Sequence, residues 1–159
     1  MPERPGLRPT PDRVRETLFN WLGQQLEGLA CLDLFAGSGA LGFEAASRGA
    51  ARVVMVENDR QAFDALSGFK RLVGFAAVEL VLADAYEYLA KTQERFDVVF
   101  LDPPFGQNAA AAALEKVLPC LAAGARVYVE SEKPVLSEGW RELKRSRAGQ
   151  VSYQLVERR

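Results

Sequence analysis

The amino-acid sequence predicts an α/β protein with a mostly parallel, doubly wound sheet and helices on both of its faces. Short apolar segments alternate with segments of helical period along all 159 residues, which is the pattern of successive strand–helix–strand units. Residues 53–56 (VVMV) and 98–101 (VVFL) are apolar throughout, as strands buried on both faces are. The length is typical of one domain, so we expect residues 1–159 to form a single domain whose first ten residues are loosely held.

Each predicted element has its own start and stop signals. Thr10 is a helix-capping residue and Pro11 suits a first helical position, so the first helix is expected over residues 11–26. Glycines or prolines end several of the later segments. Strands are expected at 31–35, 52–57, 78–82, 96–101 and 126–130, and helices at 39–47, 58–72, 85–91 and 108–121. Residues 140–147 and 150–157 are expected to form a C-terminal antiparallel hairpin, which brings the sheet to about seven strands.

The composition excludes several classes of protein. No apolar run approaches the roughly 18 residues of a membrane-spanning helix, and residues 1–11 are polar and proline-rich, unlike a signal peptide. A cytoplasmic protein without a membrane partner is therefore expected, with Cys31 and Cys120 as buried thiols. The chain has no histidine, which removes serine–histidine–aspartate hydrolysis and most zinc chemistry, and no metal is expected.

Charge is unevenly distributed along the chain. The net charge is −1, with +1 on residues 1–16, +4 on residues 141–159 and −6 on the segment between them. Basic ends around an acidic middle are compatible with nucleic-acid binding at the ends. A solvated surface with chance clustering of charge is the alternative.

A glycine-rich segment, LDLFAGSGALG at residues 32–42, follows the first predicted strand. Gly37, Gly39 and Gly42 form G-x-G-x-x-G, and Glu57 ends the next strand, where an acidic residue can accept both hydroxyls of a ribose. Ligands of such sheets bind at the carboxyl ends of the strands, and glycine lets the backbone approach them closely. The pattern suits a nicotinamide dinucleotide and also S-adenosylmethionine, whose methionine end Asp33 would face. A tight turn without a ligand is the third alternative.

Residues 102–105 (DPPF) follow the fourth predicted strand, at the same edge of the sheet. An exocyclic base nitrogen is a poor nucleophile because its lone pair is delocalised into the ring. Two acceptors, the Asp102 carboxylate and the Pro103 carbonyl, can favour its pyramidal, nucleophilic form, while the prolines stiffen the backbone. Phe105 offers a face for an unstacked base. The motif therefore favours methyl transfer to a base, and a rigid turn with a core phenylalanine is the alternative.

Together these segments resemble the bacterial 16S rRNA guanine-N2 methyltransferase family, which acts on the small ribosomal subunit. The resemblance is carried by RPTPDRVRETLFNWL at 8–22, LDLFAGSGALGFEAASRGA at 32–50, VEND at 56–59, FDVVFLDPPF at 96–105, VYVESE at 127–132 and GQVSYQLVER at 149–158. It implies a Rossmann-like class I methyltransferase fold, S-adenosylmethionine as donor, and a guanine of 16S rRNA in the small subunit or its assembly intermediate as acceptor. Family members usually carry a further basic segment before RPT, so poor activity on naked RNA is expected here.

The resemblance also implies a role for individual residues. Asp33, Gly37 and Gly39 would line the methionine part of the donor, Glu57 would hold its ribose, and Asp84 would meet its adenine. For Asp84 a helix cap is the alternative role. The implied donor-binding set is Asp33, Phe35, Ala36, Gly37, Ser38, Gly39, Glu57, Asn58, Asp84, Ala85 and Asp102. The implied catalytic set is Asp102, Pro103, Pro104 and Phe105, and the residues implied to contact RNA are Arg8, Thr10, Arg13 and Arg15.

Three other functions use parts of the same pattern. An N6-adenine methyltransferase of DNA or RNA would also use DPPF, although such enzymes commonly carry a separate recognition domain. An NAD-binding oxidoreductase would use the glycine motif, and a non-catalytic RNA-binding module would keep only the fold. The last of these is disfavoured by four intact residues, Asp33, Glu57, Asp102 and Phe105. A monomer is expected, since no heptad repeat suggests assembly.

Overall fold

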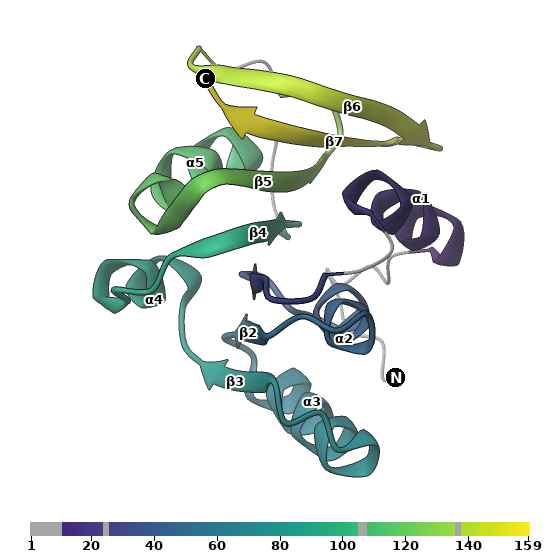
Figure 1. Ribbon diagram of the computed structural model, residues 1–159, viewed down its shortest axis with the longest axis vertical. Helices are drawn as coiled ribbons and strands as arrows, with labels where there is room; N and C mark the ends of the chain where they lie inside the picture. The colour runs from purple at the N-terminus through teal and green to yellow at the C-terminus, as the bar shows by residue number, and fades with distance from the viewer. Residues whose placement is uncertain (1–10, 24–25, 105–107, 136–137) are drawn as a thin grey trace.

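A computed structural model describes residues 11–23, 26–104, 108–135 and 138–159. In these residues seven strands form one sheet in the order β3-β2-β1-β4-β5-β7-β6 (Figure 1). Strands β1 to β5 run parallel, and β7 is antiparallel to both β5 and β6. The strands are β1 (Ala30–Asp33), β2 (Arg52–Glu57), β3 (Val78–Leu82), β4 (Phe96–Leu101), β5 (Leu121–Ser131), β6 (Trp140–Ala148) and β7 (Val151–Arg158). The predicted doubly wound sheet and C-terminal hairpin are confirmed.

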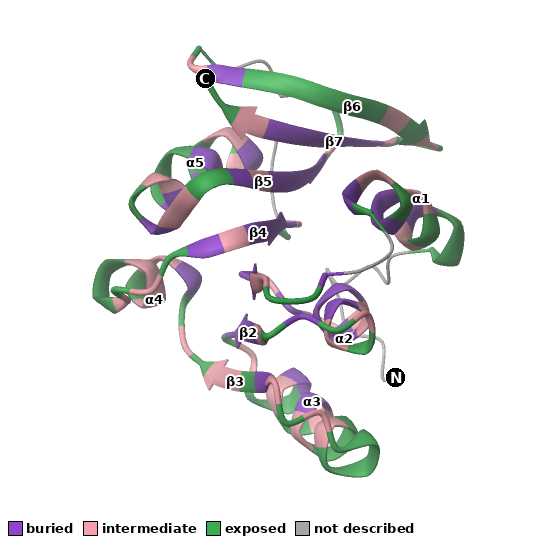
Figure 2. Ribbon diagram, viewed as in Figure 1, coloured by how far each residue is buried: buried purple, intermediate pink, exposed green. Residues whose placement is uncertain are grey.

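Helices cover both faces of the sheet (Figure 1). One face packs against α1 (Asp12–Leu22), α2 (Ala40–Ser47) and α3 (Arg60–Val73), and the other against α4 (Ala85–Lys91) and α5 (Ala109–Val117). Because side chains alternate along a strand, Val98 and Phe100 of β4 enter the first core while Val99 and Leu101 enter the second. Figure 2 shows the resulting contrast between the buried central strands and β6, which is largely exposed at the edge.

The two cysteines are free and buried, as predicted. Burial raises the pKa of Cys31 to about 12 and that of Cys120 to about 11. Both therefore remain thiols at neutral pH, and since the thiolate is the reactive form they act as small apolar core residues.

The first helix is shorter than predicted. It ends at Leu22 because Gly23 has a φ of 93°, which breaks the helical path before residue 26. Pro11 occupies the cap position with a φ of −58° and a ψ of 146°, not the first helical position. The predicted capping role of Thr10, and the predicted looseness of residues 1–10, lie outside the described residues.

The fifth strand begins five residues earlier than predicted. Helix α5 gives way at Leu118 to a 3-10 turn, Leu118–Cys120, that contains Pro119, and β5 starts at Leu121. Leu121 pairs with Phe96, but the next pair joins Arg126 to Val98, so residues 122–125 form a bulge. These residues are alanine and glycine, which have low strand propensity, and their sequence therefore does not indicate a strand. None of the helices in the described parts of the chain is long and apolar enough to cross a membrane.

Candidate active site

Four carboxylates lie at the carboxyl ends of four adjacent strands. Asp33 ends β1, Glu57 ends β2, Asp102 follows β4, and Glu130 is the second-last residue of β5. Residues two positions earlier in β1, β2 and β5 belong to the core beneath α1 and α2, so the alternation of side chains directs Asp33, Glu57 and Glu130 to that face. Asp102 lies close enough to Tyr128 of the same core to raise its pKa. Asp33 is 3% exposed, and Glu57 and Glu130 are each 7% exposed. Glu130 was absent from the sequence-based prediction.

Glu57 holds the glycine-rich loop. Its Oε1 accepts a hydrogen bond from the Gly37 N–H at 2.8 Å, and its Oε2 accepts one from the Asp59 N–H at 2.8 Å. The loop is also fixed at Ala36, whose N–H donates to the Val56 carbonyl at 2.9 Å. Gly37 and Gly39 have φ values of 53° and 86°, which favour glycine. Glu57, the carboxylate predicted to bind a ribose, thus also connects the glycine-rich loop to the end of β2 by a hydrogen bond.

Asp33 is the most deeply buried of the four carboxylates. Its Oδ2 accepts a hydrogen bond from the Gly42 N–H at 3.1 Å, which favours the ionised form. Burial has the larger effect and, together with the nearby charges of Glu57 and Glu130, raises the pKa of Asp33 to about 7. A cation that binds beside Asp33 therefore meets a group that is ready to ionise near neutral pH.

The acidic residues after β2 and β3 cap helices. Asp59 accepts a hydrogen bond from the Ala62 N–H at 2.8 Å at the start of α3, and Asp84 accepts from the N–H groups of Tyr86 and Glu87 at 3.0 and 3.1 Å at the start of α4. The helix-cap alternative for Asp84 is thus confirmed. The Ala83 N–H donates to the Glu57 carbonyl at 3.0 Å, which keeps this loop against the end of β2.

The other residues predicted to bind the donor differ in exposure. Ala36, Gly39 and Ala85 are buried, Gly37 is half-buried, and Asn58 is exposed. Phe35 and Ser38 are half-buried.

The segment after β4 lies beside the end of β5. Asp102 and Pro103 are half-buried and Pro104 is exposed, while Phe105 lies outside the described residues. Next to them, the Tyr128 hydroxyl donates a hydrogen bond to Glu130 Oε2 at 2.8 Å. Burial, Glu130 and Asp102 all raise the pKa of Tyr128, so this hydroxyl stays protonated.

The arginines predicted to contact RNA are only partly described. Arg13 is exposed on α1. Arg15 is paired with Asp12 at 3.0 Å and with Glu44 of α2 at 3.4 Å, so it joins α1 to α2. Arg8 and Thr10 lie outside the described residues.

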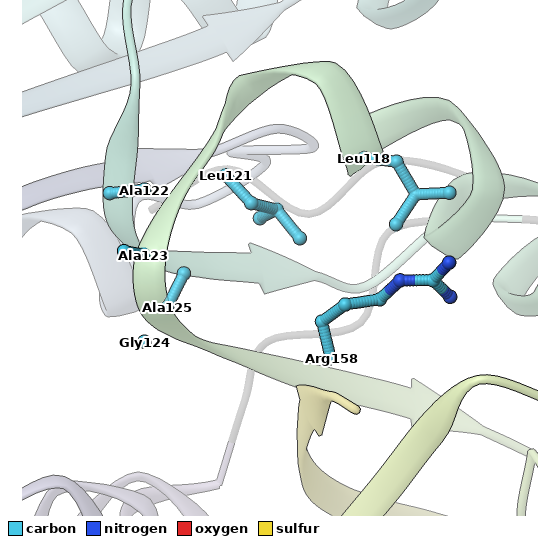
Figure 3. Close-up of a pocket in the computed structure, with 7 residues that line it drawn as sticks. All are labelled: Leu118, Leu121, Ala122, Ala123, Gly124, Ala125 and Arg158. Carbon is cyan, nitrogen blue, oxygen red and sulfur yellow. The ribbon is translucent and has the colours of Figure 1, made fainter.

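A groove of about 410 Å³ lies at the opposite edge of the sheet, where β5 begins (Figure 3). In Figure 3 the Arg158 side chain lies across it from the small side chains of the β5 bulge. It contains none of the predicted site residues. It is lined by Leu118, Leu121, Ala122, Ala123, Gly124, Ala125 and Arg158. Within the described ranges, no group of three or more acidic, cysteine or histidine side chains could hold a metal ion.

Known proteins resemble this chain over nearly its whole length. The model of a family described as conserved hypothetical protein 95 matches residues 1–157. A relative from Escherichia coli strain K12, named ribosomal RNA small subunit methyltransferase D, is 42% identical over 170 residues, which cover 99% of this chain and 83% of the relative. A relative of the same name from Haemophilus influenzae is 43% identical over 163 residues, which cover 96% of this chain and 83% of the relative.

Solved structures share the fold. An Escherichia coli structure provisionally described as a methyltransferase superposes with a TM-score of 0.87 at 38% identity, covering 95% of this chain and 88% of that one. TrmN from Thermus thermophilus superposes with a TM-score of 0.77 at 21% identity, covering 91% of this chain and 48% of that one, a likeness that concerns the fold alone.

Proposed function

The chain belongs to the family described as conserved hypothetical protein 95, together with the small-subunit ribosomal RNA methyltransferases D, and on that premise we propose that it methylates 16S rRNA. The proposed reaction transfers a methyl group from S-adenosylmethionine to the exocyclic N2 amine of a guanine. One observation carries this proposal: the glycine-rich loop and the Asp-Pro-Pro segment follow β1 and β4, which are neighbours in the sheet. Neighbouring strands lie about 4.8 Å apart, so donor and acceptor groups would share one crevice.

The residues present fit S-adenosylmethionine. The donor carries a sulfonium and an ammonium charge, and the buried Asp33 carboxylate, with its pKa of about 7, offers a counter-charge. A carboxylate has about four acceptor sites, and two backbone N–H groups use two of those on Glu57, so a ribose can also be bound there. Asp84 would contribute at the adenine end while it caps α4.

The chemistry needs an electrophilic methyl group, which the bound donor supplies. We assign Asp102 and the Pro103 carbonyl to the amine, where they accept its hydrogens and draw its lone pair out of conjugation. Asp102 also takes up the proton, directly or through water, as the nitrogen becomes positive. Positioning and electrostatics supply most of the rate enhancement in such a transfer. Phe105 is proposed to stack on the base, and Arg8, Thr10, Arg13 and Arg15 to contact the RNA.

The decisive experiment is methyl transfer from labelled S-adenosylmethionine to small subunits that lack the modification, followed by identification of the modified nucleoside and its position. We expect N2-methylguanosine. Recovery of N6-methyladenosine would favour the adenine alternative, which the same Asp-Pro-Pro-Phe segment could serve. The donor should also raise the melting temperature, since a ligand that binds only the native state stabilises it, and NAD should not. Tight NAD binding without binding of the methyl donor would contradict the proposal.

A further inference from the structure

The second carboxylate on the target side of the crevice, Glu130, has no role in the proposed transfer. Leu101 pairs with Val129, so the next residues, Asp102 and Glu130, adjoin one another at the ends of neighbouring parallel strands. The backbones of such strands are about 4.8 Å apart. The Glu130 side chain continues the alternation that directs Tyr128 to the face beneath α1, and Asp102 lies close enough to Tyr128 to raise its pKa. A base whose amine is held by Asp102 would therefore present its adjacent ring position to Glu130.

Glu130 is held in one orientation. The fully buried Tyr128 donates its hydroxyl hydrogen to Glu130 Oε2 at 2.8 Å. The Tyr128 ring is itself fixed between Phe100 and Tyr153, at centroid distances of 6.4 and 6.5 Å. A hydrogen bond donated to a carboxylate favours its ionised, acceptor-only form. The pair thus presents a fixed acceptor, which is the property that recognition of a hydrogen-bond donor requires.

Guanine and adenine differ at the ring nitrogen next to the amine that would be methylated. Guanine has a donor there, N1–H, beside its N2 amine. Adenine has a lone pair there, N1, beside its N6 amine. Asp102 and Pro103 can accept hydrogens from either amine, so they do not distinguish the two bases. A carboxylate at the adjoining position accepts from guanine N1–H and repels the adenine lone pair.

We propose that Glu130 selects guanine by accepting a hydrogen bond from its N1–H, and that Tyr128 is the positioning residue for that carboxylate. This inference rests on the proposed function and adds the group that decides between its two candidate bases. Sites built to pair with a donor strongly reject an analogue that lacks it, and here a carboxylate oxygen would face the adenine lone pair. Residues of β5 would then discriminate guanine from adenine, and the segment after β4 would accelerate methyl transfer.

The test uses small subunits reconstituted with 2-aminopurine at the methylated position. This base keeps the 2-amine but has a lone pair at N1. We expect the wild-type protein to prefer guanine by on the order of 100-fold or more in kcat/KM. In Glu130→Gln the amide can still accept from Tyr128 and can donate to a lone pair, so the preference should fall below about 10-fold. Because both enzymes are compared on the same two substrates, the intrinsic reactivity of 2-aminopurine cancels.

Three controls separate the possible outcomes. Glu132→Gln changes an exposed carboxylate just beyond β5 and should keep the wild-type preference. Tyr128→Phe retains the ring packing and should reduce the preference by loosening Glu130, which gives a second measurement if Glu130→Gln folds poorly. Donor affinity should change little in Glu130→Gln when calorimetry is done at about pH 9, where Asp33 is ionised with or without the nearby Glu130 charge. An unchanged preference in Glu130→Gln and Tyr128→Phe would overturn the inference and leave the proposed function intact, whereas no transfer by the wild-type protein to guanine would contradict the proposed function itself.

Discussion

The two halves of the carboxyl edge of the sheet are built differently. On the proposed donor side, after β1 and β2, carboxylates accept hydrogen bonds from nearby backbone N–H groups, as Glu57 does from Gly37 in the glycine-rich loop and Asp33 does from Gly42 in α2. On the proposed target side, after β4 and β5, Glu130 is instead held by a side-chain hydroxyl, and Asp102 and Pro103 are half-buried. The comparison teaches that the donor-side carboxylates support the fold, and in the proposed function they would also bind the ligand. Target-side changes should therefore affect turnover more than stability.

The largest expected effect tests the target side. Asp102→Ala should lower the single-turnover rate by about 1000-fold, since it removes the group assigned to the reacting amine. The melting temperature should change little, because a half-buried carboxylate after the end of β4 contributes little packing. Rapid-quench measurement with labelled donor gives the rate, and circular dichroism gives the melting curve. A near-normal rate would remove Asp102 from the mechanism.

The matching change on the donor side is Glu57→Ala. It leaves two backbone N–H groups without their acceptor and should lower the free energy of unfolding by about 3 kcal/mol, the cost of two charge-assisted hydrogen bonds. Donor affinity should fall by about 10- to 100-fold in the same variant. Urea titration and calorimetry measure the two effects, and Glu57→Gln, which keeps one acceptor, is the milder control. Loss of affinity at unchanged stability would contradict the double role of Glu57.

A smaller effect is expected on stability when a glycine of the donor-side loop is replaced by alanine. A Cβ at Gly39 would lie 2.6 Å from Leu66 and 2.7 Å from Phe43, and Gly39 has a φ of 86°. Gly149, at the hairpin turn, has a φ of 58° with nothing within 4 Å of such a Cβ. Gly39→Ala should therefore cost about 2 kcal/mol or more of stability, and Gly149→Ala about 1 kcal/mol. Equal losses of unfolding free energy in denaturant titrations would show that the glycine-rich loop accommodates a Cβ as easily as the hairpin turn does.

The smallest effect is the pH dependence of donor binding. Because the pKa of Asp33 is raised to about 7, this residue is protonated in a fraction of the protein molecules at neutral pH. A cationic donor favours its ionised form. Donor affinity should rise by about 10-fold from pH 6 to pH 8, and Asp33→Asn should remove the rise. Calorimetry across that range tests this. For the free protein the sign is opposite: a carboxyl whose folded pKa exceeds its unfolded value of 3.8 contributes less stability as pH rises from about 4 to 7.

The sequence predicts the sheet well because the signals for it are local. Apolar strands, the glycine loop and the Asp-Pro-Pro segment each identify themselves within a few residues, and their shared edge follows from the parallel topology. The role proposed for Glu130 depends on β5 adjoining β4, so a local sequence pattern could not predict it. One signal was present: Tyr128 and Glu130 are two residues apart on a strand and so share a face. The β5 bulge was missed because its alanines and glycine do not resemble a strand.

The order in which the chain is synthesised affects when the target side of the crevice can fold. Arg126 donates a hydrogen bond to the Leu22 carbonyl, 104 residues earlier, and Trp21 stacks on Tyr153 at 5.7 Å. Helix α1 is therefore synthesised before strands β5 and β7, against which it packs. Such non-local contacts close slowly, and a nascent chain that has not yet released β7 leaves α1 and β5 without these neighbours. The donor side can assemble while synthesis continues, whereas the target side is completed only after the C-terminal hairpin has emerged.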